Sequence, residues 1–217
     1  MKLPGKANYQ LSTINYQLFK PAYTLIELLI VLSLIGIATA LVTTAYLGFE
    51  RRERVKASAL ALQNNIRLAQ NSAHSGNKGF EGDKCDTAAG EILIGWYVTI
   101  DGGSQTYTIT GDCLSSAIPP MERKFSEKTF KLAKDVNFLS INTVSPLSIM
   151  FRPLVENATF HSSAASSGVD PDFIDDTSHE LINPLGADEI IMVLKGTSPY
   201  KYQVRVNLAG GVSAKRI

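Results

Sequence analysis

The stretch that decides the fold is Leu28–Phe49, LLIVLSLIGIATALVTTAYLGF, a run of 22 residues without a charged side chain. An α-helix rises about 1.5 Å per residue, so this run would extend over about 33 Å, close to the ~30 Å hydrocarbon core of a bilayer. The apolar segment of a cleaved secretory signal is shorter, at about 7–15 residues. The run therefore predicts a helix that inserts into a membrane, rather than a core helix of a soluble protein.

Basic residues flank this run on both sides. The leader 1–22 contains Lys2, Lys6 and Lys20 and no acidic residue, and the segment after the run reads Glu50-Arg51-Arg52-Glu53-Arg54. The positive-inside rule therefore does not decide the orientation. Long C-terminal domains cross membranes largely regardless of their charge. We therefore expect a single-pass membrane protein, with its N-terminus inside and its C-terminal domain on the outer side.

One acid, Glu27, stands at the edge of the apolar run. A carboxylate is costly in lipid, so two interpretations are open. Glu27 is either an interfacial acid favoured by the dipole of a helix N-terminus, or it has a cationic partner. If the chain were cut after Ala22, Glu27 would be the fifth residue, about 6 Å along the helix from the new α-amino group of Tyr23.

The segment Ala22–Val31, AYTLIELLIV, followed by Ile35-Gly36-Ile37-Ala38, resembles the class III signal and N-terminal segment of type IV pilins and type II secretion pseudopilins. The resemblance implies that a prepilin peptidase cleaves between Ala22 and Tyr23 and methylates the new amine of Tyr23. It also implies that Glu27 pairs with the N-terminal amine of a neighbouring subunit during filament assembly. The family usually has Gly where this chain has Ala22, which is similarly small.

A helical pattern continues beyond the apolar run. Apolar residues recur at spacings of three and four, which indicates a one-sided stripe: Val55, Ala59, Leu62, Ile66, Ala69 and Ala73. The pattern fades in His74–Gly79, which has the glycines of a helix terminus. No proline lies between Pro21 and Pro119, so nothing predicts a proline kink. We expect one helix from Tyr23 to Ala73, with a coiled coil as the less favoured alternative.

The rest of the chain predicts an antiparallel β domain. The final predicted strand alternates apolar and polar residues and runs into the turn sequence Leu208–Val212, which predicts a terminal hairpin. The predicted strands are Ile92–Ile100, Thr106–Thr110, Thr129–Leu132, Val136–Ile141, Leu147–Phe151, Ala158–His161, Glu189–Lys195 and Tyr200–Asn207.

The expected fold is thus α+β, a long N-terminal helix packed on a C-terminal antiparallel β domain. By layout it resembles the pilin fold of minor pilins and pseudopilins of the H type. The expected organisation is a leader peptide (1–22), a transmembrane and assembly helix (23–49), an amphipathic extension (50–75) and an exported β domain (76–217).

No motif indicates an active site, so we expect no enzyme, no catalytic residue and no cofactor. His74, His161 and His179 are far apart in the sequence and are expected to be exposed polar residues. An acidic segment, VDPDFIDD, contains four aspartates whose oxygens suit calcium: Asp170, Asp172, Asp175 and Asp176. It lacks the EF-hand spacing, so a solvated loop is favoured over a calcium site.

Cys85 and Cys113 are the two cysteines of the chain. An exported domain meets oxidising conditions, which favours a disulfide between them over two buried thiols. A zinc site is not favoured, because no histidine pair lies near either cysteine.

Charge bears on the partners. From Glu50 onward the chain has 18 Lys+Arg and 19 Asp+Glu, so it has no overall field for a polyanion, and we expect no nucleic-acid partner. The resemblance implies as partners the membrane, prepilin peptidase, assembly platform proteins, and other pilin or pseudopilin subunits that contact the N-terminal helix. It also implies a location in the cytoplasmic (inner) membrane and, after assembly, in the filament. The favoured function is a structural filament subunit. The alternatives are a signal-anchored β binding domain that does not polymerise, and a membrane-tethered enzyme.

Overall fold

The computed structural model describes residues 23–80, 82–115, 122–143, 145–162, 185–197 and 199–217. The chain divides into two compact units, with the boundary between Thr44 and Ala45. One continuous helix, α1 (Leu25–His74), begins in the first unit and ends in the second. The predicted leader, 1–22, lies outside the described residues.

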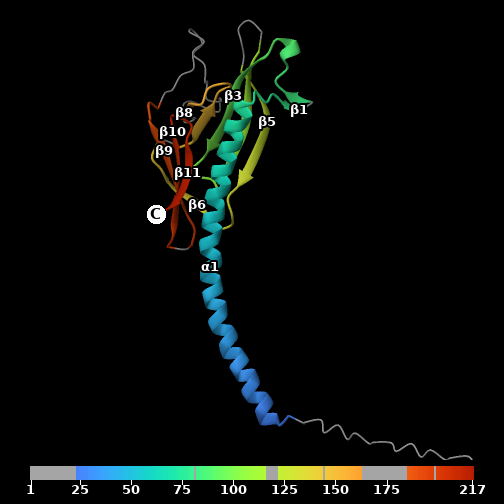
Figure 1. The fold of residues 1–217 in the computed structure, drawn as a ribbon, viewed down its shortest axis with the longest axis vertical. Coiled ribbons are helices and arrows are strands. Elements are labelled where there is room, and N and C mark those ends of the chain that lie inside the picture. Colours follow the sequence, from blue (N-terminus) through green and yellow to red (C-terminus); the bar gives the residue numbers. More distant parts are fainter. Residues whose placement is uncertain (1–22, 81, 116–121, 144, 163–184, 198) are drawn as a thin grey trace, which may run out of the picture. The chain divides into compact units, whose positions relative to one another are not determined.

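The second unit combines the last part of α1 with antiparallel strands (Figure 1). A short two-stranded ribbon and a 3-10 turn follow the helix: β1 (Gly79–Phe80), β2 (Asp83–Lys84) and η1 (Thr87–Ala89). The longer strands are β3 (Ile92–Ile100), β4 (Thr106–Leu114), β5 (Glu122–Lys131), β6 (Asn137–Ile141), β7 (Leu147–Phe151), β8 (Ala158–Ser162), β9 (Glu189–Lys195), β10 (Lys201–Asn207) and β11 (Val212–Arg216).

These longer strands form two sheets. One has the order β5-β4-β3-β7-β8 and the other the order β11-β10-β9-β6. Every pair of neighbouring strands is antiparallel. The predicted terminal hairpin is present as β10 and β11, with Val206 opposite Val212. The α+β prediction, a long N-terminal helix followed by antiparallel sheets, is therefore confirmed.

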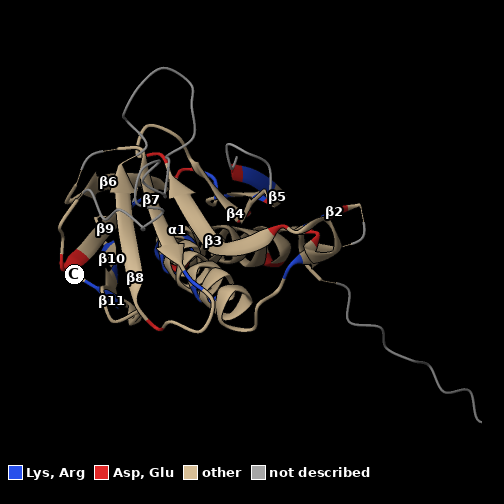
Figure 2. Cartoon of the chain, turned by 90° about the horizontal axis from the view of Figure 1, so that it is seen from above, with Lys and Arg blue, Asp and Glu red and all other residues tan. Residues whose placement is uncertain are grey.

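The second part of α1 buries the predicted apolar stripe. Ser58 on the same side of the helix is 5% exposed, and the six predicted members of the stripe are completely buried: Val55, Ala59, Leu62, Ile66, Ala69 and Ala73. They share one hydrophobic core with residues of both sheets, including Val98, Ile149 and Val204. In Figure 2 the strands lie around one side of this part of the helix.

Polar side chains of α1 also hold the end of the last hairpin. Gln63 and Arg67 donate to the carbonyl oxygen of Val212, at 3.1 and 2.9 Å, and Gln70 donates to that of Gly210 at 3.1 Å. Because β11 is the edge strand of its sheet, Val212 would otherwise present an unpaired carbonyl there. The helix therefore stabilises this edge by hydrogen bonds as well as by burial.

The strand predictions failed mainly at β5, which is longer than the predicted Thr129–Leu132. Its sequence, ERKFSEKTFK, has six charged residues and lacks a long apolar alternation. The strand forms because it pairs with β4 along its length, while its other edge is unpaired among the described residues. Charged side chains are a common protection of such edges. The acidic and basic residues at the start of β5 are visible in Figure 2.

The buried stripe gives a direct test of this packing. Leu62→Ala should lower the free energy of unfolding of the second unit by about 2–5 kcal/mol, because it leaves a cavity in a core that has no exposure to solvent. Leu60→Ala is the matched control, since Leu60 lies on the same helix and is 41% exposed. Urea unfolding of the full chain in detergent, followed by the fluorescence of Trp96, measures both. Equal losses in the two variants would contradict the assigned helix face.

Candidate functional site

The first part of α1 presents an apolar surface that the described chain does not cover. Every residue from Tyr23 to Phe49 is exposed, including Leu25 at 81% and Leu41 at 69%. The helix is long and apolar enough to cross a membrane, and none of its most apolar window is buried in the protein. This surface therefore suits a lipid environment or contact with other apolar helices.

The serine and threonine hydroxyl groups within this apolar part bond to the helix itself. Ser33 donates to the carbonyl oxygen of Ile30, Thr39 to that of Ile35 and Thr43 to that of Thr39, at 2.7–2.8 Å. Thr44 donates to the carbonyl oxygen of Leu41 at 2.9 Å. A polar group in hydrocarbon is costly unless it has a hydrogen bond, so these contacts make the four hydroxyls compatible with lipid.

The N-terminus of α1 has a cap that the sequence analysis did not identify. Thr24 precedes the helix, and its hydroxyl oxygen accepts a hydrogen bond from the backbone N–H of Glu27, at 3.3 Å. Thr24-Leu25-Ile26-Glu27 is a Thr-X-X-Glu sequence, which is the pattern of a capping box. The pattern was present in the sequence. Part of the motif therefore has a local structural role besides the one that the pilin resemblance implies.

The predicted processing and assembly residues lie at this end of the helix. Tyr23 is 75% exposed and Glu27 is also exposed, so both are accessible to another molecule. Ala22 lies outside the described residues. Cleavage, methylation and the pairing of Glu27 with a neighbouring subunit stay predictions.

In the second unit, Cys85 and Cys113 are joined by a disulfide. Their Cα atoms are 5.8 Å apart, which is a usual separation for a disulfide. Both residues are buried. Cys85 follows the β1–β2 ribbon and Cys113 belongs to β4, so the bond attaches the segment after the helix to the five-stranded sheet.

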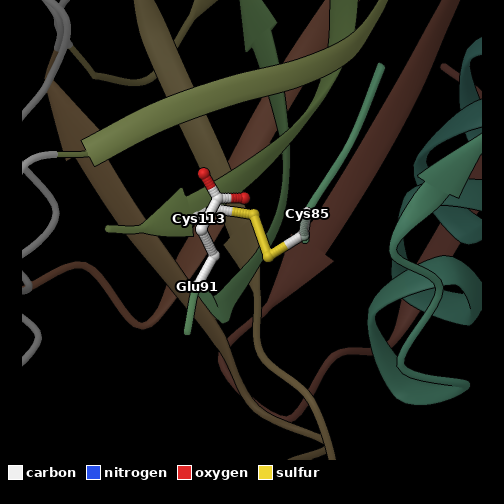
Figure 3. A group of neighbouring side chains, drawn as sticks. All are labelled: Cys85, Glu91 and Cys113. Carbon is white, nitrogen blue, oxygen red and sulfur yellow. A yellow bond between two sulfur atoms is a disulfide. The ribbon is translucent and has the colours of Figure 1, made fainter. Parts of the chain in front are cut away.

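An ion pair between Glu91 and Arg123 lies beside this disulfide. Glu91 is the neighbouring side chain in Figure 3, and its carboxylate accepts two hydrogen bonds from Arg123, at 2.8 and 2.7 Å. It also accepts one from the backbone N–H of Asp86 at 2.7 Å. The hydrogen bonds from Arg123, followed by that from Asp86, lower the pKa of Glu91 to about 2. Sequence reasoning missed this pair, because Glu91 and Arg123 are 32 residues apart and form no motif.

The trio of Cys85, Glu91 and Cys113 has the side-chain proximity of a metal site, with potential ligand atoms within 4.8 Å of one another. Two features of the structure favour a structural role. The sulfur atoms are bonded to each other, so neither is a thiolate, and the Glu91 carboxylate is held by Arg123 and Asp86. The arrangement therefore joins the start of the β region to two strands of the five-stranded sheet.

The histidine prediction was wrong at one position. His161 in β8 was expected to be exposed, but it is buried, with only 1% of its surface exposed. It lies within a strand whose side chains are largely buried. Its ring Nε2 lies 3.0 Å from the hydroxyl oxygen of Thr159, and burial lowers the pKa of His161 to about 4. His74 is exposed at the end of α1, as expected. His179 lies outside the described residues.

The calcium candidates of the acidic segment also lie outside the described residues: Asp170, Asp172, Asp175 and Asp176.

Comparisons of this chain with protein-family models, with curated proteins and with solved structures found no match.

The buried histidine predicts a pH dependence of stability. The unfolded chain takes up a proton at His161 near pH 6.5, whereas the native side chain does so only near pH 4. The unfolded state therefore binds more protons between these values, and the free energy of unfolding should fall, by up to about 3 kcal/mol, as the pH drops through this window.

Urea unfolding between pH 7.5 and 4 measures this effect. The loss of stability over that range should be smaller in His161→Gln than in the wild-type protein, and it should be unchanged in His74→Gln, which removes an exposed histidine. An identical pH profile for His161→Gln and the wild type would show that this ring does not carry the effect.

Proposed function

We propose that this chain is a structural subunit of a type IV pilus-like or type II secretion filament, of the minor pilin or pseudopilin kind. The observation that carries the proposal is the segment Ala22–Val31, in which one acid follows a small residue, an aromatic residue and Thr-Leu-Ile at the start of an uncharged run. The exposed apolar helix supports the proposal, and so do the antiparallel strands that follow it, β1 to β11, which we call the β unit. They are also compatible with a protein that is only anchored.

In this proposal the apolar helix has two successive environments. Before assembly the subunit lies in the inner membrane, with Tyr23–Phe49 in lipid and the β unit on the outer side. Assembly platform proteins then transfer it to the filament, where neighbouring helices replace the lipid. The partners are prepilin peptidase, the membrane, the platform and other subunits that contact α1.

Glu27 makes the transfer of the subunit from lipid to the filament favourable. An uncompensated charge in a dry helix bundle costs several kcal/mol, and so does an unpaired N-terminal ammonium. Pairing the Glu27 carboxylate with the methylated amine of a neighbouring Tyr23 removes both costs, since methylation retains the positive charge. Because the lipid-embedded subunit lacks this partner, the pair favours the assembled state over the free one.

The second candidate is a signal-anchored protein that does not polymerise, and the cap of α1 is the observation that favours it. The Thr24 hydroxyl already bonds to the backbone of Glu27, so the Thr-Leu-Ile-Glu sequence has a local explanation that needs no neighbouring subunit. The two candidates differ in what the Glu27 side chain does. A cap needs a hydrogen-bond acceptor near the helix N-terminus, whereas assembly needs a negative charge.

The proposal predicts that the mature chain begins at Tyr23. In a host with an active prepilin peptidase, mass spectrometry of the membrane-bound protein should show loss of residues 1–22 and a methylated Tyr23 amine. Ala22→Arg should block both, because the cleavage site requires a small residue. A chain that retains Met1 in the same host would sink this prediction.

Three substitutions separate the two candidates. Glu27→Leu and Glu27→Gln both remove the charge, and Gln retains the capping-box pattern, so both should insert normally but fail to enter filaments. Thr24→Val removes the capping hydroxyl and leaves the charge, so it should still assemble. Membrane level, leader removal and recovery in sheared filaments are measured for each variant.

If Glu27→Gln assembles as well as the wild type, the carboxylate charge has no assembly role and the anchored protein is the better account. A defect in membrane level that is shared by Thr24→Val and Glu27→Leu would point to the cap instead.

A further inference from the structure

A cluster of basic residues lies where α1 meets one end of the four-stranded sheet. At this end of the four-stranded sheet, β9 ends and β10 begins, and Lys195 lies directly opposite Lys201 in the strand register. On the next pair of strands, Arg216 near the end of β11 is opposite Tyr202 of β10. Lys134 lies shortly before the start of β6, which pairs with β9 through Asn137 and Lys195.

The helix contributes basic residues to the same place. The guanidinium groups of Arg52 and Arg216 lie over the ring of Tyr200, at 5.1 and 4.2 Å from its centroid. The turn between β9 and β10 is close to the helix, since a Cβ atom on Gly196 would be 2.8 Å from a methyl carbon of Val55. Arg51 is exposed next to Arg52. We call this cluster the basic collar: Arg51, Arg52, Lys134, Lys195, Lys201 and Arg216.

The acidic residues near the collar are engaged by other basic residues. Arg54 is within ion-pair distance of Glu50, at 2.5 Å, and of Asp135, at 3.8 Å. Glu53 pairs with Lys56 at 3.4 Å. Among the described residues, no acidic side chain forms an ion pair with a member of the collar. The chain from Glu50 onward has a net charge of −1, so the collar is a local concentration of charge.

This concentration opposes the stability of the isolated fold. Like charges directly opposite each other on neighbouring strands are destabilising, and Lys195 and Lys201 have that arrangement. Two guanidinium groups also share the ring of Tyr200. An external anionic surface would relieve both repulsions.

The collar lies at the depth of lipid head groups if the apolar run spans the bilayer. The run ends at Phe49, and Arg51 and Arg52 follow within one helical turn. Val55, which marks the level of the strand ends, is six residues beyond Phe49, or about 9 Å along the helix. Lysine and arginine side chains extend far enough to reach the phosphate layer from that level.

We propose that the basic collar binds the anionic phospholipid head groups of the leaflet that faces the β unit, and so holds this unit against the membrane surface. Tyr200, between two arginines, has the ring and hydroxyl that suit the membrane interface. Each phosphate would supply an anionic partner where no acidic side chain of the described residues pairs with a collar residue. This inference rests on the membrane span and does not depend on filament assembly.

The test uses the full chain reconstituted in mixed phosphatidylcholine–phosphatidylglycerol bilayers. Electron spin resonance of spin-labelled lipids measures how strongly each lipid associates with the protein. The wild-type protein should prefer phosphatidylglycerol over phosphatidylcholine by roughly threefold or more, and salt should weaken the preference. A triple variant, Lys195→Gln, Lys201→Gln and Arg216→Gln, should lose most of it.

The matched control removes three exposed lysines away from the collar: Lys78→Gln, Lys84→Gln and Lys128→Gln. It should retain the preference, as should Glu27→Leu, which tests filament assembly separately. Urea unfolding checks that both triple variants are folded. Equal association of the two lipids with the wild-type protein, or equal losses in the two triple variants, would overturn the proposal. Binding of an anionic oligonucleotide without lipid selectivity would overturn it too.

Discussion

A large apolar surface that the chain does not bury has to be covered by something else. The first part of α1 is such a surface, since leucines and isoleucines are exposed all round it up to Phe49. Its backbone is satisfied within the helix, and its serine and threonine hydroxyls bond to carbonyls one turn earlier. These hydroxyls therefore do not require water. In a filament subunit, lipid would cover this surface before assembly and neighbouring helices would cover it afterwards.

The same helix becomes part of a conventional protein core a few residues later. From Val55 the apolar residues occupy one side only, and the sheets pack on that side. Polar residues of the helix hold the last hairpin, and the disulfide with the Glu91–Arg123 pair fixes the segment that follows the helix to the sheet. The β unit is thus joined to α1 by burial, hydrogen bonds and a covalent bond nearby. A pulling force on α1 would therefore act directly on the β unit.

Periodic features of the structure were predictable from the sequence, and features made by distant residues were not. The buried stripe from Val55 to Ala73 and the bounds of β3, β7 and β9 follow from apolar spacing alone. The charged strand β5 carries no such pattern, because its pairing with β4 decides its conformation. His161 was expected at the surface because no catalytic or metal-binding motif includes it, and the sequence of a strand does not show how deeply its side chains are covered. The basic collar arises from strand register, which brings Lys195 opposite Lys201, and from packing that places Arg52 over the ring of Tyr200.

The central claim is that the apolar surface of α1 contacts other subunits once its charge pair can form. Photo-crosslinking at Leu32, in cells that contain a pilus or secretion assembly system, measures this contact most directly. The account predicts protein adducts to neighbouring subunits in the chain with Glu27, and mainly lipid adducts in the chain with Glu27→Leu. Lipid adducts alone in both chains, at equal membrane levels, would contradict it and leave the helix as a simple anchor.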